Sequence, residues 1–419
     1  MKAKEKKTLA LVSLGCAKNV VDLQGIAGGL LKNGYTLSPN PDRADLVVVN
    51  TCAFIASARE ETEAEIVRAL ELKARGNYGR VVVTGCYPKR YPHSAARFPG
   101  VDGWQGVPEE WDEPAMPGLR FTGKAFAYLK IAEGCAHRCA YCAIPAIRGK
   151  FRSRPVASIL KEAKALLQSG CRELNIVAQD PMLYGCDLGE GRMSLVDLLW
   201  KIDRLPGEFW VRVLYSYPSE ITPGFIDWLN RSRHAVKYID VPLQHTVPEV
   251  LARMNRRQAI DASLVAAEAL RVAVPGVTLR STIMTGFPGE TPARFKILLS
   301  DLSRMQFDHL GAFAYSPEAG TKGAKLKNRP SRAVAEDRER QVMALAEKIW
   351  RERAGRLVGQ TFPALCVDRG VARMPSQAPD VDGVVYLLDS RKARKVQAGD
   401  FIQVRLVKLS GFDFEGDVL

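Results

Sequence analysis

The segment that constrains this chain most contains three closely spaced cysteines, Cys135, Cys139 and Cys142. They follow a predicted strand, Ala127–Ile131, so the chain must turn after that strand around whatever the three thiolates bind. Their C-x-x-x-C-x-x-C spacing can supply ligands to three irons of a cubic four-iron cluster but leaves the fourth iron without a protein ligand. The spacing therefore predicts a [4Fe-4S] cluster with one iron open to another molecule.

A structural zinc site is the main alternative for these cysteines. Structural zinc usually takes four ligands in two pairs, and no second cysteine pair follows at zinc-finger distance. His137 could serve as a fourth ligand, although its two-residue offset from Cys135 fits poorly. Burial of all three cysteines as small hydrophobic residues is a weaker alternative, because their spacing is that of ligands.

The string C-x-x-x-C followed by x-Tyr-Cys resembles the signature of the radical S-adenosylmethionine (SAM) enzymes. This resemblance implies that SAM binds the open iron through its amine and carboxylate. One electron from the cluster then cleaves a carbon–sulfur bond of SAM to give a 5'-deoxyadenosyl radical. Such a radical can abstract hydrogen from carbon atoms that acid–base catalysis cannot activate.

The composition favours a large cytoplasmic protein with an anionic partner. The chain has 419 residues, enough for two or three domains, and no run approaches the ~18 apolar residues of a membrane helix. Nine cysteines in a reducing compartment are more typical of metal ligands and free thiols than of disulfides. The net charge of +14 favours RNA, the ribosome or an acidic protein face as partner, and we expect a monomer without membrane contact.

The first domain is predicted at residues 8–120 as an open parallel α/β sheet. Three short runs have the continuous hydrophobicity of buried parallel strands, namely Leu9–Leu14, Asp45–Asn50 and Arg80–Gly85. Helical patterns lie between them at Val20–Lys32, with Asn19 as the expected N-cap, and at Ala58–Arg75, with a capping box at Ser57–Glu60. The β-α-β-α-β order predicts a parallel sheet.

Each of these three strands runs into a cysteine, Cys16, Cys52 or Cys86. The carboxyl ends of parallel strands lie along one edge of a sheet, so we expect the three thiols to meet there. A single cysteine after a strand is more often structural, but the repetition favours a second cluster. Gly15 and Gly85 would let the backbone approach a bulky cofactor closely.

The strings VSLGCAKN, VVVNTCAFI and VVVTGCYPKRY resemble the N-terminal domain of the methylthiotransferases. This resemblance implies that Cys16, Cys52 and Cys86 hold an auxiliary [4Fe-4S] cluster. The chain has Asp22-Leu23-Gln24 where that family usually has Asp-Ser-Glu, a difference that leaves the cysteines intact.

The central domain is predicted at residues 121–355 as a partial (β/α)6 barrel, with its active site at the carboxyl ends of the strands. The six predicted strands are Ala127–Ile131, Glu173–Ala178, Trp210–Tyr215, Tyr238–Pro242, Thr278–Met284 and His309–Ala314. Polar residues expected to line the barrel mouth are Glu133, Gln179, Asp180, Tyr215, Tyr217, Gln244 and His245.

The radical SAM resemblance implies particular contacts with SAM. Gln179 and Asp180, in the segment AQD, correspond to the segment that faces the amino group of SAM, and Gln244 is a further candidate. The segment TGFPGE, which contains Gly286, resembles the adenine-side segment. The basic loop Arg148–Arg154 could bind an acidic group of a substrate, or it could be a solvated flexible loop.

The last domain is predicted at residues 356–419 as a small antiparallel β-barrel of about five strands. It resembles the TRAM module, which implies RNA or ribosome contact, and the basic run Arg391–Lys395 is consistent with that. Cys171, Cys186 and Cys366 follow no ligand pattern and are interpreted as structural.

Both cysteine triads together resemble those of a radical SAM methylthiotransferase, which needs two [4Fe-4S] clusters, SAM and a reductant. The strings GCAKNVVD, IPAIRG, AQD and YSPEAGT resemble the branch that thiomethylates the β-carbon of an aspartate in the decoding-centre protein of the small ribosomal subunit. The alternative branch modifies an adenosine of tRNA and typically has GQN where this chain has AQD. A zinc-dependent RNA-binding protein and an iron–sulfur electron carrier are the hypotheses from other classes.

Overall fold

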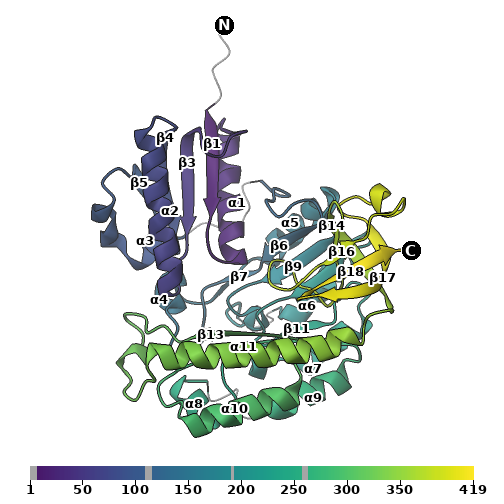
Figure 1. Cartoon of the computed structure of the whole chain (residues 1–419). Helices are drawn as coiled ribbons and strands as arrows, with labels where there is room; N and C mark the ends of the chain where they lie inside the picture. Colours follow the sequence, from purple (N-terminus) through teal and green to yellow (C-terminus); the bar gives the residue numbers. More distant parts are fainter. Residues whose placement is uncertain (1–6, 109–115, 190–192, 257–262) are drawn as a thin grey trace. The chain divides into compact units, whose positions relative to one another are not determined.

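The first part of the chain builds a five-stranded parallel sheet in the order β2-β1-β3-β4-β5 (Figure 1). We describe residues 7–108, 116–189, 193–256 and 263–419 of a computed structural model. The strands are β1 (Thr8–Ser13), β2 (Thr36–Leu37), β3 (Ala44–Thr51), β4 (Tyr78–Gly85) and β5 (Gly103–Trp104). The helices that follow them are α1 (Ala17–Lys32), α2 (Ala56–Ala74) and the short α3 (Cys86–Arg90).

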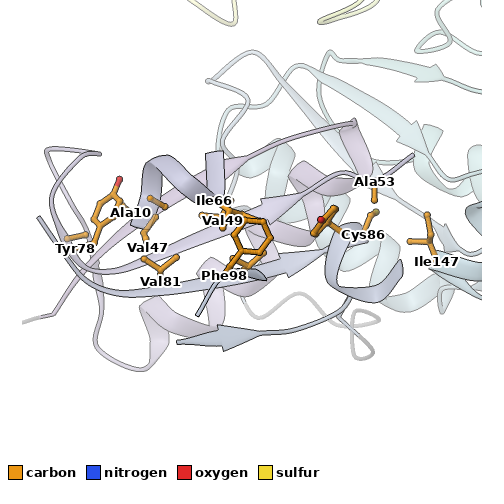
Figure 2. Close-up of a cluster of buried hydrophobic side chains, with 14 of the residues drawn as sticks. Ala10, Val47, Val49, Ala53, Ile66, Tyr78, Val81, Cys86, Phe98 and Ile147 are labelled. Carbon is orange, nitrogen blue, oxygen red and sulfur yellow. The ribbon is translucent and has the colours of Figure 1, made fainter. Parts of the chain in front are cut away.

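The two faces of this sheet pack against different helices. Val47 and Val49 of β3 point into a core that includes Ile66 of α2, as Figure 2 shows. The intervening residues of β3, Leu46 and Val48, pack with Leu23 of α1 on the opposite face. The alternation of side chains along the strand thus buries both faces, which explains the uninterrupted hydrophobic run in the sequence. The predicted open α/β sheet is confirmed.

The predicted helix caps of this domain are wrong. Helix α1 begins three residues earlier than expected, with Cys16 at its N-cap position, and Asn19 lies inside the first turn. The Asn19 side chain bonds instead to backbone atoms of neighbouring loops, as described below. Helix α2 has Ile55 at its N-cap position without a side-chain cap, so the capping box at Ser57–Glu60 does not form.

The central domain contains two three-stranded parallel sheets, in the orders β10-β9-β6 and β11-β12-β13. The six strands are β6 (Phe126–Lys130), β9 (Glu173–Val177), β10 (Trp210–Val213), β11 (Tyr238–Asp240), β12 (Thr278–Thr285) and β13 (His309–Ala314). A small hairpin adds β7 (Ala132–Glu133) and β8 (Arg152–Ser153). All six predicted strands are present within a few residues, and the predicted alternation of strands and helices in this domain is confirmed.

Helices alternate with these strands along the chain (Figure 1). They are α4 (Ile144–Arg148), α5 (Val156–Gln168), α6 (Leu195–Asp203), α7 (Pro223–Arg231), α8 (Pro248–Arg253), α9 (Ser263–Ala273), α10 (Pro292–Met305) and α11 (Arg332–Gly355). In the described part of the chain, no helix combines the length and the apolar character needed to cross a bilayer.

The C-terminal segment closes into a barrel in the order β14-β15-β16-β18-β17. Its strands are β14 (Thr361–Asp368), β15 (Val371–Arg373), β16 (Val385–Leu387), β17 (Phe401–Ser410) and β18 (Asp413–Val418). The small barrel is confirmed, but it is not wholly antiparallel, because β16 and β18 pair in parallel. Its core also takes in Trp350 of α11.

This terminal barrel contacts the central strands at their amino-terminal ends. Glu173, the first residue of β9, is fully buried and binds Arg212 of β10 and Arg373 of β15. Tyr238, the first residue of β11, donates to Asp382 over 2.7 Å. The carboxyl ends of these strands, where a barrel of this class carries its chemistry, are therefore opposite the end that the terminal barrel occupies.

By the density of its internal contacts the chain divides into two units. The first comprises the described residues up to Phe121 together with Tyr128–His137 and Cys142–Leu166. The second comprises Thr122–Ala127, Arg138–Tyr141 and Leu167–Leu419. The segments on either side of Cys139 thus belong to the same unit as the N-terminal sheet.

Candidate functional site

Three cysteines lie at the carboxyl edge of the N-terminal sheet: Cys52 and Cys86 come directly after β3 and β4, and Cys16 comes three residues after the end of β1. A Cβ atom added to Gly15 would lie 3.2 Å from the Sγ of Cys52, so the loops that carry Cys16 and Cys52 touch. Gly15 has φ +95°, a conformation that favours glycine. The convergence of the three strand-end loops expected from the parallel sheet is therefore present.

Asn19 ties these loops together. Its Nδ2 atom donates to the carbonyl of Leu14 over 2.8 Å and to that of Thr51 over 3.0 Å. Its Oδ1 atom accepts a weak hydrogen bond from the thiol of Cys86, with sulfur and oxygen 3.7 Å apart. The side chain is 1% exposed, so these bonds form away from water. One asparagine thus fixes the residues that precede two cysteines and contacts the third cysteine itself.

The electrostatics around the three thiols differ. Desolvation by surrounding protein atoms opposes ionisation of the Cys16 thiol. The cations of Lys18 and Arg148 outweigh this desolvation, so the pKa of Cys16 lies below its ordinary value. Burial raises the pKa of Cys52 above its ordinary value and raises that of Cys86 to about 12. Bound iron would have to displace the protons of the two latter thiols, and the nearby cations favour the thiolates that result.

The donor set suits a metal cluster better than a single ion. Within the described residues, no three His, Cys, Asp or Glu side chains are placed to hold one metal ion together. Three thiols on loops that follow strands of one parallel sheet can bind separate irons of a cubic cluster, and the ligands of such a cluster stand farther apart than those of one ion. Cys16, Cys52 and Cys86 could therefore hold three irons of such a cluster.

Arg148 is buried next to these cysteines, although the sequence predicted that it belongs to a substrate-binding or solvated loop. Its Nη2 atom donates to the Sγ of Cys86 over 3.4 Å and to the Oδ1 of Asn19 over 2.5 Å. Its Nη1 atom binds Asp22. Arg154, at the end of the same loop, is also buried and pairs with Glu162. Both interpretations of these two arginines are therefore wrong, because each neutralises a buried carboxylate.

Glu133 was predicted to line the barrel mouth but belongs to the same buried group of charges. Its Oε2 atom lies 2.9 Å from Nζ of Lys130 and 3.1 Å from Nη1 of Arg148. Burial opposes ionisation of Glu133, but Lys130 and Arg148 lower its pKa to about 2. The carboxylate is therefore committed to these two cations at neutral pH.

The loop of the second cysteine triad is shaped by local bonds. The amide of Cys135 donates to the carbonyl of Gly149, and the Sγ of Cys142 accepts from the amide of Ile144 over 3.4 Å. Gly134 has φ +71°, and a Cβ there would lie 2.1 Å from the carbonyl oxygen of Lys150. Only glycine fits this crossing of the chain just before Cys135.

Cys139 belongs to the second unit and has a buried arginine beside it. Nη1 of Arg256 lies 3.7 Å from the Sγ of Cys139 and 3.3 Å from the hydroxyl of Tyr141. Arg256 also stacks over the ring of Tyr217, with its guanidinium carbon 4.2 Å from the ring centroid. No local pattern predicts this role for Arg256, because it lies 117 residues from the cysteine it contacts.

Strained and incompletely bonded residues collect at the carboxyl ends of the central strands. Tyr215 and Gln244 have φ +69° and φ +70°, rare values for residues with side chains. Ser216 Oγ, Gln244 Oε1 and Thr246 Oγ1 are buried without a hydrogen-bond partner in the protein. Buried polar atoms are normally satisfied, so these three atoms mark a place where a polar ligand could bind.

The other predicted SAM contacts are placed as follows. Gln179 and Asp180 follow β9, and Asp180 accepts a bond from the amide of Met182 over 3.0 Å. Gly286 follows β12 with φ +75°, and a Cβ there would lie 2.2 Å from the Cβ of Ala335 in α11. The contact with α11 is sufficient to require glycine at this position, so Gly286 carries no separate signal for a cofactor.

His245, predicted at the mouth, is fully buried and faces Glu290, with Nε2 and Oε2 3.2 Å apart. Its Nδ1 atom accepts from the amide of Val247, which leaves the proton on the nitrogen that faces the carboxylate. Glu290 also accepts from Arg338 over 2.6 Å. The pair braces the segment after β12 rather than presenting a free histidine.

Comparisons with known proteins agree with this architecture. Three family models match the chain: Uncharacterized protein family UPF0004 at residues 8–106, the Radical SAM superfamily at 129–302 and the TRAM domain at 358–419. The predicted domain limits of 8–120, 121–355 and 356–419 remain predictions.

Among solved structures, the radical SAM methyltransferase TsrM from Kitasatospora setae, with cobalamin and a [4Fe-4S] cluster bound, matches with a TM-score of 0.54. The match covers 76% of this chain and 77% of that one at 16% sequence identity, so it shows the fold alone.

Curated relatives match over nearly their full length. The ribosomal protein uS12 methylthiotransferase RimO of Syntrophobacter fumaroxidans is 37% identical, with 99% of both chains covered. The protein of the same name from Moorella thermoacetica is 39% identical, with 98% of this chain and 99% of that one covered. The chain therefore belongs to the RimO family of radical SAM methylthiotransferases.

Proposed function

We propose that this protein adds a methylthio group to the β-carbon of an aspartate in ribosomal protein uS12. The observation that carries the proposal is the joint presence of two cysteine triads, each shaped by its own loops, in a chain of the RimO family. A radical SAM domain alone would generate a substrate radical. A second triad on the N-terminal sheet supplies a separate place from which sulfur can be delivered.

The six cysteines divide into two ligand sets. We assign the auxiliary [4Fe-4S] cluster to Cys16, Cys52 and Cys86, and the radical SAM [4Fe-4S] cluster to Cys135, Cys139 and Cys142. When bound, SAM and these clusters supply a 5'-deoxyadenosyl radical for hydrogen abstraction and a methylthio group for transfer.

The remaining residues position ligands and exclude water. Gln179, Asp180 and Gln244 lie at strand ends where they can bind polar groups of SAM, and the Oε1 atom of Gln244 is buried without a hydrogen-bond partner in the protein. The strained backbone at Gln244 holds that amide in place at a cost in folding energy, as is common at sites built for a ligand. Positioning of this kind supplies much of the rate enhancement when the reactive species is a radical.

The partners follow from the same family. The proposed substrate is ribosomal protein uS12, and the TRAM domain together with the net charge of +14 supports an RNA contact near it. We place the reaction in the cytoplasm, with an external reductant for the clusters. That the protein is a monomer remains a prediction.

Mass spectrometry of cells that lack this gene tests the substrate. We expect uS12 to lose the mass of one methylthio group, while the methylthio nucleosides of tRNA stay at wild-type levels. Reintroducing the gene should restore the modified uS12. Loss of a methylthio nucleoside with uS12 unchanged would show that the protein modifies tRNA adenosine, which the names of the matched relatives do not favour.

A further inference from the structure

Four charged side chains form a buried group beside the N-terminal sheet. Lys130 and Arg148 supply two positive charges, and Asp22 and Glu133 supply two negative ones. All four side chains are at most 10% exposed. The two positive charges balance the two negative ones. Removing any one of the four side chains would therefore leave an uncompensated charge in a low dielectric.

Arg148 also reaches a predicted cluster ligand, Cys86. Its Nη1 atom is held by Asp22 and Glu133 at 2.6 Å and 3.1 Å, which leaves Nη2 directed at Asn19 and Cys86. The planar fork of the guanidinium makes this division possible, because its nitrogen atoms point in fixed directions. Lysine could neutralise the same carboxylates but has no second arm for the sulfur.

Arg148 and Glu133 lie on either side of the segment that carries Cys135 and Cys142. Arg148 follows Cys142 by six residues, and Glu133 precedes Cys135 by two. Both residues belong to the first unit, as does the sheet that carries Cys86. The segment that carries Cys135 and Cys142 is therefore held at both ends by a charge group that includes Asp22 of α1.

We propose that Arg148 is a positioning residue that raises the reduction potential of the auxiliary cluster through its hydrogen bond to Cys86. This inference rests on the assignment of that cluster to Cys16, Cys52 and Cys86. Hydrogen bonds to ligand sulfurs and the local charge are the protein's main means of setting such potentials. A cationic donor stabilises the extra negative charge of the reduced cluster, so its removal makes reduction harder.

The test uses the full chain with Cys135, Cys139 and Cys142 changed to alanine, so that only the auxiliary cluster can form. Iron and sulfide are measured first, and then the midpoint potential is determined by reductive titration monitored by electron paramagnetic resonance. If no cluster forms in this background, the cysteine assignment fails, whatever the role of Arg148. If the cluster forms, the effect of Arg148 can be read directly.

Two substitutions are compared in this background. Arg148→Met removes both the charge and the hydrogen bond, and Arg148→Lys keeps the buried charges balanced while removing the arm that reaches Cys86. Both should move the potential to a more negative value, with the larger shift in Arg148→Met. Arg148→Lys also protects the test against misfolding, because Asp22 and Glu133 keep a cation.

Arg154→Met is the matched control. Arg154 is as deeply buried in the same segment, but its guanidinium group is directed at Glu162, Ser158 and the carbonyl of Lys130. Its substitution should leave the potential unchanged. An unchanged potential in both Arg148 variants, a wild-type potential in Arg148→Lys, or an equal shift in Arg154→Met would each overturn the proposal.

Discussion

The sharpest energetic prediction concerns Glu173, which joins the terminal barrel to the central strands. Its carboxylate is fully buried, with Oε1 2.8 Å from Nε of Arg212 and Oε2 bound to Arg373 of β15. Glu173→Gln removes the negative charge that pairs with both of these cations, and breaking a buried pair by removing one partner costs about 3–5 kcal/mol. Because Arg373 lies in the terminal barrel, that barrel should bear most of the loss.

Native-state hydrogen exchange measures this loss locally, which suits a multidomain chain without a single unfolding transition. The free energy of opening at the amides of β14 and β15 should fall by about 3–5 kcal/mol in Glu173→Gln. Asp389→Asn breaks an ion pair with Arg394 whose two side chains are 70% exposed, and it should cost at most about 1 kcal/mol. A loss in Glu173→Gln as small as that of the control would refute the reasoning.

The stabilisation that Glu173 contributes should depend on pH. Burial opposes ionisation of Glu173, but Arg373 and Arg212 outweigh it and lower its pKa below the ordinary value of 4.5. The charge of Glu173 therefore contributes its full stabilisation above about pH 4.5, and the contribution is lost as the pH falls through the lowered folded value. The difference in the free energy of opening between the wild type and Glu173→Gln should be constant near neutral pH and should become smaller below pH 4.5.

Three further predictions follow from the structure. Asn19→Ala leaves the buried carbonyl of Thr51 and the half-buried carbonyl of Leu14 without their donor, and the buried one costs about 1–3 kcal/mol. It should also reduce the iron bound by the first triad, measured by metal analysis, whereas unchanged loading would contradict the role of Asn19. Gly286→Ala should cost about 1–3 kcal/mol more in thermal unfolding than Gly276→Ala, because only the former meets a facing helix; equal costs would argue against that contact. Cys366 is buried, and burial raises its pKa to about 11. It should therefore resist alkylation in the folded protein while the exposed Cys186 reacts. Rapid modification of Cys366 would show that the terminal barrel opens.

Local sequence patterns predict most of the fold. Continuous hydrophobic runs predicted β1, β3 and β4, because strands buried on both faces need no polar alternation. A cysteine after each run predicted their convergence, since parallel strands end along one edge of a sheet. The parallel pairing of β16 with β18 could not be predicted, because short strands with similar patterns do not specify their neighbours.

The residues that surround the cysteines could not be predicted in the same way. Arg148 binds Asp22, which lies 126 residues away, and no local pattern signals so distant a pair. The position of Asn19 predicts a helix cap, a common role of asparagine before a helix, but its side chain bonds to two loops. The place of Glu133 after a strand predicts that it lines the barrel mouth, but its ion pairs with Lys130 and Arg148 bury it instead.

The central claim is that two cysteine triads perform separate tasks in one reaction, and Cys16→Ala tests it most directly. The purified variant is incubated with SAM, a reductant and uS12, and both 5'-deoxyadenosine and the mass of uS12 are measured. The two-cluster assignment predicts that 5'-deoxyadenosine still forms while uS12 gains no methylthio group. Methylthio-modified uS12 formed to the wild-type extent would contradict the assignment of the first triad.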